Sequence, residues 1–122
     1  MTLDDLNTFC ATLTAAHHVV QWGDHDVWKV GIEGKGKVFA IAGTQPDGHL
    51  SVSFKVSDMA FEILRDHPDC RPAPYLASRG MKWIQYYTGD QMTGNEVCDL
   101  LRDSHRLVAA GLPKKTQKEL NL

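Results

Sequence analysis

The segment LSVSFKV, residues 50–56, constrains the fold of this chain more than any other part of the sequence. Apolar and polar residues alternate in it without a break: Leu50, Ser51, Val52, Ser53, Phe54, Lys55 and Val56. Because successive side chains of a strand point to opposite faces of a sheet, this pattern predicts a half-buried antiparallel strand with one polar face. We therefore expect a sheet that is covered on one face and polar on the other.

Three segments have the periodicity and the start signals of amphipathic helices. They cover about residues 3–16, 58–66 and 94–110. Thr2 and Ser57 are suitable N-caps for the first two, and Thr93 forms a capping box with Glu96 at the start of the third. One face of the third helix is expected to be buried, with Val97, Leu100, Leu101, Ser104, Leu107 and Val108.

Short strand-like segments lie between these helices. They are HVVQW (18–22), VWKVGI (27–32), VFAIA (38–42) and KWIQYY (82–87). The second segment places Trp28, Val30 and Ile32 on one face, and the third is apolar on both faces, as in a central strand. The order of elements predicts an α+β fold, in which a mainly antiparallel sheet has helices packed on one face.

The length of 122 residues predicts a single compact domain over 1–122, with a core at about 3–112 and a polar tail at 113–122 that frays. No run approaches the roughly 20 apolar residues that span a bilayer, so no membrane association is expected. The start of the chain does not have the pattern of a signal peptide. The cysteines, Cys10, Cys70 and Cys98, show no evident pairing, which points to the cytoplasm.

The sequence contains no recognisable catalytic or metal-binding motif. There is no Gly-x-Ser-x-Gly, His-Glu-x-x-His or Cys-x-x-Cys sequence. Asp24-His25-Asp26 could offer ligands to a metal, but an exposed polar turn explains it more simply. The glycines of residues 31–37 lack the spacing of a phosphate-binding loop and are typical of a hairpin turn. We therefore expect no enzymatic activity, no catalytic residue, no metal and no cofactor.

Charge is distributed unevenly, although the formal net charge is only -2. The first 28 residues hold four aspartates and no Lys or Arg, whereas lysines are frequent in the predicted hairpins and in the tail. A basic face on an acidic protein would suit the phosphate backbone of a nucleic acid. The alternative is a solvated sheet edge, where lysines prevent pairing between edges. The candidate phosphate contacts are Lys35, Lys37, Arg79, Lys82, Lys114 and Lys115.

Residues 71–87, RPAPYLASRGMKWIQYY, combine two prolines, four large aromatics and three basic residues with no acidic one. Pro72 and Pro74 stiffen the approach to a strand, and Gly80 permits a tight turn before it. In the strand, one face is expected to carry Trp83, Gln85 and Tyr87, and the other Ile84 and Tyr86. We interpret the segment as a basic loop that leads into a strand with most of its aromatics in the core.

Several segments together resemble the MmcQ/YjbR-like family. They are Trp22-Gly23, Val27-Trp28-Lys29-Val30-Gly31, Lys37-Val38-Phe39-Ala40, Pro72-Ala73-Pro74-Tyr75-Leu76 with Lys82-Trp83, Ser104-His105-Arg106-Leu107-Val108 and Leu112-Pro113-Lys114-Lys115. The similarity extends over about residues 3–119. It implies a fold similar to the frataxin-like CyaY fold, in a small cytoplasmic bacterial protein. By analogy at the level of the fold, it also implies DNA binding through a "double wing" arrangement of hairpins.

Two kinds of function remain open at this point. The first is non-catalytic binding of DNA or another nucleic acid through the basic residues of the hairpins and loops. The second is a protein- or small-ligand-binding module that uses the sheet face, with Trp28, Tyr75 and Trp83 as anchors. An iron-binding role like that of frataxin would require an acidic first helix, and this helix offers only Asp4 and Asp5.

Overall fold

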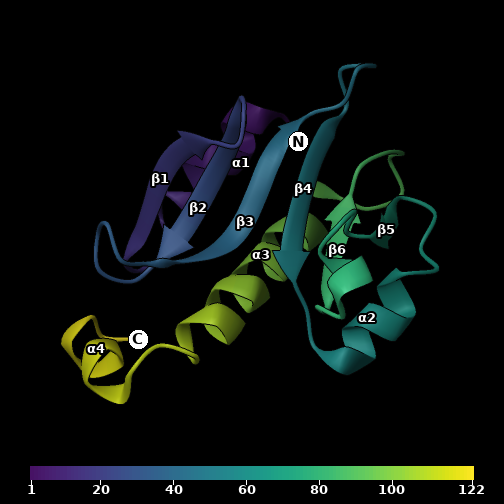
Figure 1. The fold of residues 1–122 in the computed structure, drawn as a ribbon. Helices are drawn as coiled ribbons and strands as arrows, with labels where there is room; N and C mark the ends of the chain where they lie inside the picture. Colours follow the sequence, from purple (N-terminus) through teal and green to yellow (C-terminus); the bar gives the residue numbers. More distant parts are fainter.

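Six antiparallel strands form one sheet with the order β1-β2-β3-β4-β6-β5 in the computed structural model, which describes residues 1–122 (Figure 1). The elements in chain order are α1 Leu3–Cys10, β1 Ala16–Gln21, β2 His25–Val30, β3 Lys37–Thr44, β4 Leu50–Lys55, α2 Asp58–Leu64, β5 Cys70–Pro72, the 3-10 helix η1 Ala77–Arg79, β6 Trp83–Tyr86, α3 Gly94–Ala109 and α4 Lys114–Glu119. The predicted α+β class with an antiparallel sheet is confirmed.

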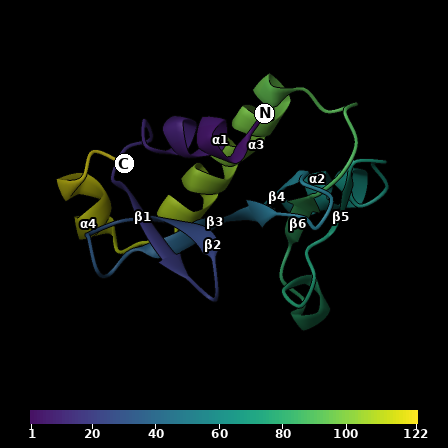
Figure 2. The same ribbon diagram turned by 90° about the horizontal axis from the view of Figure 1, so that it is seen from above.

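Helices α1 and α3 lie on the same side of the sheet (Figure 2). The predicted caps Thr2, Ser57 and Thr93 all form, and Thr93 closes its capping box with Glu96. The core between the helices and the sheet includes, among other residues, Leu6, Phe39, Val52, Phe54, Ile84, Val97 and Leu101. The alternation in residues 50–56 is therefore explained, because its apolar members face α3.

A bulge in β3 ties α3 to the sheet. Trp28 of β2 pairs with Ala40, but the next residue, Lys29, pairs with Val38, which leaves Phe39 without a partner on β2. The Ser104 hydroxyl donates a hydrogen bond to the Phe39 carbonyl (2.6 Å) and accepts one from the Lys55 amide (2.9 Å). Because Ser104 is fully buried, it is a polar link between α3 and two adjacent strands.

Three details of the prediction are wrong. The first helix ends at Cys10 instead of about residue 16: the amides of Thr12 and Leu13 bond to carbonyls only three residues earlier, Ala15 takes up a left-handed conformation (φ 56°), and the chain enters β1 at Ala16. Ile32 does not share the buried face of Trp28, since β2 ends before it, and its side chain is 42% exposed.

The third difference concerns the polar tail, which forms helix α4 instead of fraying. The Gln117 side chain donates to the carbonyls of Ala110 (3.2 Å) and Leu112 (2.7 Å). Both carbonyls follow the last residue of α3, where no further helical turn is present to satisfy them. These bonds hold α4 against the C-terminal end of α3.

Candidate functional site on the open face of the sheet

The face of the sheet that points away from α1 and α3 is polar and basic, and we call it the open face. Strand alternation and pairing place on it, among others, Val27, Lys29, Ile41, Ser51, Ser53, Lys55, Arg71 and Gln85. None of the strand positions on this face holds Asp or Glu. The polar side of the 50–56 alternation is thus part of a larger surface without carboxylates, in which Val27, Ile41 and Trp83 are apolar.

Basic residues gather at one end of the sheet, where β2 and β4 finish and β3 and β6 begin. This basic end consists of Lys29, Lys35, Lys37, Lys55 and Lys82. Lys29 and Lys55 both lie on the open face two strands apart, so their backbones are separated by roughly 10 Å. The opposite end of the sheet carries Asp24 and Asp47 in its turns, whereas Glu33 is the one acidic residue of the β2–β3 turn that holds Lys35 at the basic end.

The cations of the open face and the basic end are free of carboxylate partners. Only three of the thirteen Lys and Arg residues form ion pairs, each with an acid three positions earlier along the chain: Arg65, Arg102 and Arg106. All three are on α3 or at the end of α2. The lysines of the basic end are therefore not held in ion pairs, although Glu33 lies in the same turn as Lys35.

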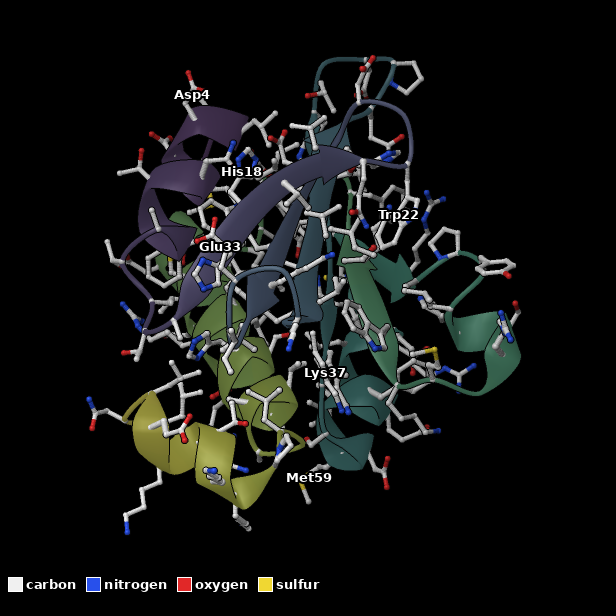
Figure 3. The ribbon with its side chains drawn as sticks, turned by 60° about the vertical axis from the view of Figure 1, so that its left-hand side comes forward. Asp4, His18, Trp22, Glu33, Lys37 and Met59 are labelled. Carbon is white, nitrogen blue, oxygen red and sulfur yellow. The ribbon has the colours of Figure 1, made fainter.

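The six predicted phosphate contacts fall into three places. Lys35, Lys37 and Lys82 belong to the basic end, and Lys37 donates to the carbonyl of Gly111 (3.3 Å), which brings the α4 residues Lys114 and Lys115 near the same end. Figure 3 shows Lys37 toward α4.

Two of the predicted contacts lie against aromatic rings: the Lys82 ammonium is 4.8 Å from the centre of the Phe61 ring of α2, and the other is the sixth predicted contact, Arg79. It donates to the Tyr75 hydroxyl (2.9 Å), and its guanidinium carbon lies 5.5 Å from the centre of the Tyr75 ring. Both residues belong to the segment that carries η1.

A groove of about 480 Å³ lies on the open face between the β1–β2 turn and the segment that carries η1. Its walls and floor are formed by Trp22, His25, Ile41, Ser51, Ser53, Pro74, Tyr75, Leu76 and Gln85. Figure 3 shows Trp22 in the β1–β2 turn, on the side of the sheet away from α1. The floor continues into the basic end, because Lys55 follows Ser53 by two residues on the same face.

The polar groups of the groove floor have hydrogen-bonding capacity that the protein does not use. Arg71 donates to the Gln85 side-chain oxygen (2.8 Å), so the amide NH2 of Gln85 is left without a partner in the protein. His25 Nδ1 lies 2.8 Å from the Trp22 carbonyl, which can only accept, so the neutral ring presents Nε2 as an acceptor. The Ser51 and Ser53 hydroxyls form no hydrogen bond within the protein and can donate or accept.

Both aromatic walls of the groove have an unfavourable backbone conformation. Trp22 has a φ of 53° and Tyr75 one of 71°, in the left-handed region that bulky residues rarely adopt. Their side chains are also exposed, at 58% and 69%. Two exposed aromatics that are kept in strained positions around one groove are more typical of a binding site than of a structural turn.

Of the predicted ligand anchors, only Tyr75 faces this groove. Trp28 and Trp83 are each 5% exposed. Trp28 packs in the core and donates from its indole nitrogen to the Asn7 side chain (2.9 Å). The exposed aromatic partner of Tyr75 is Trp22, which is not among the anchors predicted from the sequence.

Asp24, His25 and Asp26 do not converge on one point. Asp26 accepts a hydrogen bond from His18 (2.6 Å), whereas His25 turns toward the Trp22 carbonyl. No group of three His, Cys, Asp or Glu side chains is arranged to hold a metal ion. Burial raises the pKa of the Cys10 and Cys70 thiols to about 12, so both are protonated at neutral pH.

Comparison with known proteins places the chain in a family. The sequence model described as YjbR matches residues 11–107. The chain belongs to the YjbR family. This confirms the resemblance noted from the sequence. No helix of this YjbR-family chain is long and apolar enough to cross a membrane.

Relatives and solved structures agree with this assignment. The Uncharacterized protein YbdF of Escherichia coli O157:H7 is 29% identical over 99 residues, which are 80% of this chain and 75% of that protein. The fold also matches the crystal structure of Deinococcus radiodurans protein DR2400, of family domain DUF419, with a TM-score of 0.85 and 30% identity. The match covers 99% of this chain and 88% of the DR2400 chain. A Pseudomonas syringae protein with 17% identity shares the fold, with a TM-score of 0.71 over 88% of this chain and 99% of its own.

Proposed function

We propose that this protein binds nucleic acid on the open face of its sheet, without catalysis and without a required cofactor. The observation that carries the proposal is the group of unpaired cations at the basic end, beside a groove with exposed aromatic walls. On the helix-covered side, α1 holds Asp4 and Asp5 and no Lys or Arg. The molecule thus presents one face to which a polyanion is attracted.

In this proposal the basic end contacts phosphates. Lys29 and Lys55 project from adjacent parts of the open face, while Lys35, Lys37 and Lys82 extend the surface at its rim. Lys114 and Lys115 of α4 add contacts on the far side of Lys37, and Arg79 adds one beside the groove. Each phosphate that is neutralised on a single strand adds about 0.7 to the dependence of log K on log salt concentration.

Fluorescence anisotropy with a labelled 12-nucleotide single strand tests the proposal at 50 mM and 200 mM salt. We expect the double variant Lys29→Gln/Lys55→Gln to bind more weakly and to reduce the salt slope by about 1.4. The matched control is Arg102→Gln/Arg106→Gln, which removes the same charge from α3 and should leave the slope nearly unchanged. Lys114→Gln/Lys115→Gln tests the contribution of α4.

Absence of binding by the unmodified protein at 50 mM salt would refute the proposal. Equal losses in the open-face variant and the α3 control would also refute it, because the attraction would then depend on total charge and not on this face.

A second candidate function is the binding of a free small molecule, and the size and neutral floor of the groove favour it. Cavities of about 300–1,000 Å³ are typical of small-molecule sites. Thermal-shift measurements with free nucleosides and other small heterocycles distinguish this function, since it predicts stabilisation by a compound without phosphates.

A further inference from the structure

We infer that the groove on the open face holds one unpaired base of a single strand, stacked against Trp22 and Tyr75, while the basic end holds the neighbouring phosphates. This inference rests on the proposed function and adds the class of nucleic acid and the group that is recognised. It predicts a preference for single strands over duplexes, because a paired base cannot enter the groove.

The aromatic walls supply the stacking surface. Trp22 and Tyr75 come from segments more than 50 residues apart and line the same groove. Stacking of one base on an aromatic side chain changes affinity by about 5- to 150-fold. It needs no particular base, because every base has a flat π-face.

The floor of the groove matches the edge of a base better than it matches a charged ligand. The amide NH2 of Gln85 is an obligatory donor, and Nε2 of neutral His25 is an acceptor. The hydroxyls of Ser51 and Ser53 can do either. Every base carries both donors and acceptors on its pairing edge, and these edges are free in a single strand.

The position of the groove relative to the cations favours a strand over a free base. Lys55 is two residues from Ser53 on the same strand face, a distance of about 7 Å along the strand. Lys29 stands in the same relation to Val27, whose partner Ile41 lines the groove. A base in the groove therefore has unpaired lysines within reach of its own backbone.

Gly43 of β3 keeps the floor open. A Cβ atom at this position would lie 3.4 Å from His25 Cδ2, 3.7 Å from His25 Nε2 and 3.9 Å from Ser51 Oγ. A larger side chain here would occupy the space between two floor residues. Its backbone has no left-handed φ, so a β-branched side chain is compatible with the strand.

Competition anisotropy tests the inference with three unlabelled competitors: a 12-nucleotide single strand, the same strand with every base replaced by an abasic tetrahydrofuran unit, and the corresponding duplex. We expect the single strand to bind at least about 5-fold more tightly than the abasic strand. Trp22→Asn and Gly43→Val should each lower its affinity toward the abasic level and leave abasic binding unchanged. Met59→Gln, which changes a side chain that is 75% exposed on α2, should alter neither affinity.

Intrinsic fluorescence gives a second readout, because Trp22 is 58% exposed and Trp28 and Trp83 are 5% exposed. Saturable quenching by the single strand, absent with the abasic strand and in Trp22→Asn, is the expected result. Equal affinity for base-containing and abasic strands would overturn the inference and leave the proposed function in place. If no competitor binds at 50 mM salt, both fail.

Discussion

The two faces of β4 are both largely covered, but they differ in the chemistry of their side chains. Toward α3, Val52 and Phe54 are fully buried and belong to the core. Toward the open face, Ser51 and Ser53 are 8% and 7% exposed, yet their hydroxyls have no partner in the protein. The open face is therefore neither a core nor an ordinary solvated surface. Adjacent residues of one strand serve two purposes: one set holds the sheet to the helices, and the other lines a groove.

The largest expected contrast is between Phe54→Ala and Ser53→Ala. The phenyl ring is fully buried, so its removal leaves a cavity and should lower the free energy of unfolding by about 3–5 kcal/mol. Removal of the Ser53 hydroxyl breaks no internal hydrogen bond and should change it by less than about 0.5 kcal/mol. Urea unfolding followed by circular dichroism measures both. A Ser53→Ala loss above 1 kcal/mol would show that the open face contributes to stability.

A smaller loss is expected where a polar group serves the covered face. Ser104→Ala removes the hydroxyl that bonds to the Phe39 carbonyl and the Lys55 amide, and leaves both backbone groups unsatisfied beneath α3. The free energy of unfolding should fall by about 1–3 kcal/mol. Ser51→Ala is the matched control on the open face, where no internal bond is lost. Equal values for the two variants would contradict the linking role of Ser104.

The fold was largely predictable because its signals are local. The capping box of α3 and the alternation in residues 50–56 each depend on neighbouring residues, and both were correct. The role of Ser104 was not predictable. The sequence placed it on the buried face of its helix, but the bulge that leaves the Phe39 carbonyl free arises from pairing between strands. α1 was predicted too long for a similar reason, since its end is set by the entry of the chain into the sheet.

The groove was not predictable because it joins five separate segments of the chain. Trp22 and Tyr75 line the same groove only after the sheet has formed. In the sequence, the alternation around Ser51, Ser53 and Gln85 predicts nothing more than the polar side of ordinary strands. One signal was available in the sequence: Trp22 precedes Gly23 in a short turn, where a large aromatic is unusual. The predicted anchors Trp28 and Trp83 were selected for their size, which is equally typical of buried residues: Trp28 belongs to the core, and Trp83 pairs with Lys55 on the open face but is only 5% exposed.

Trp22 and Trp28 extend the comparison of the two faces to a single residue type. Trp28 is buried beside His18, with ring centres 5.0 Å apart, and its indole nitrogen has a hydrogen-bond partner. Trp22 has a left-handed backbone and an exposed ring. Trp28 therefore stabilises the fold, whereas the left-handed backbone of Trp22 lowers its stability.

The only change of opposite sign, a small gain in stability, is therefore expected for Trp22→Asn. Asparagine adopts the left-handed conformation more readily than other residues with a side chain, and it is favoured before glycine in such turns. Little buried surface is lost, so the free energy of unfolding should rise by up to about 1 kcal/mol. The same variant is expected to lose affinity for single strands.

Thermal and urea unfolding measure the change in stability of Trp22→Asn. The destabilising control is Trp28→Phe, which removes the partly buried hydrogen bond to Asn7. A fall in stability by more than about 0.5 kcal/mol would mean that the Trp22 ring supports the hairpin itself. A gain in stability together with a loss of binding would show that the strain at Trp22 is maintained for the ligand.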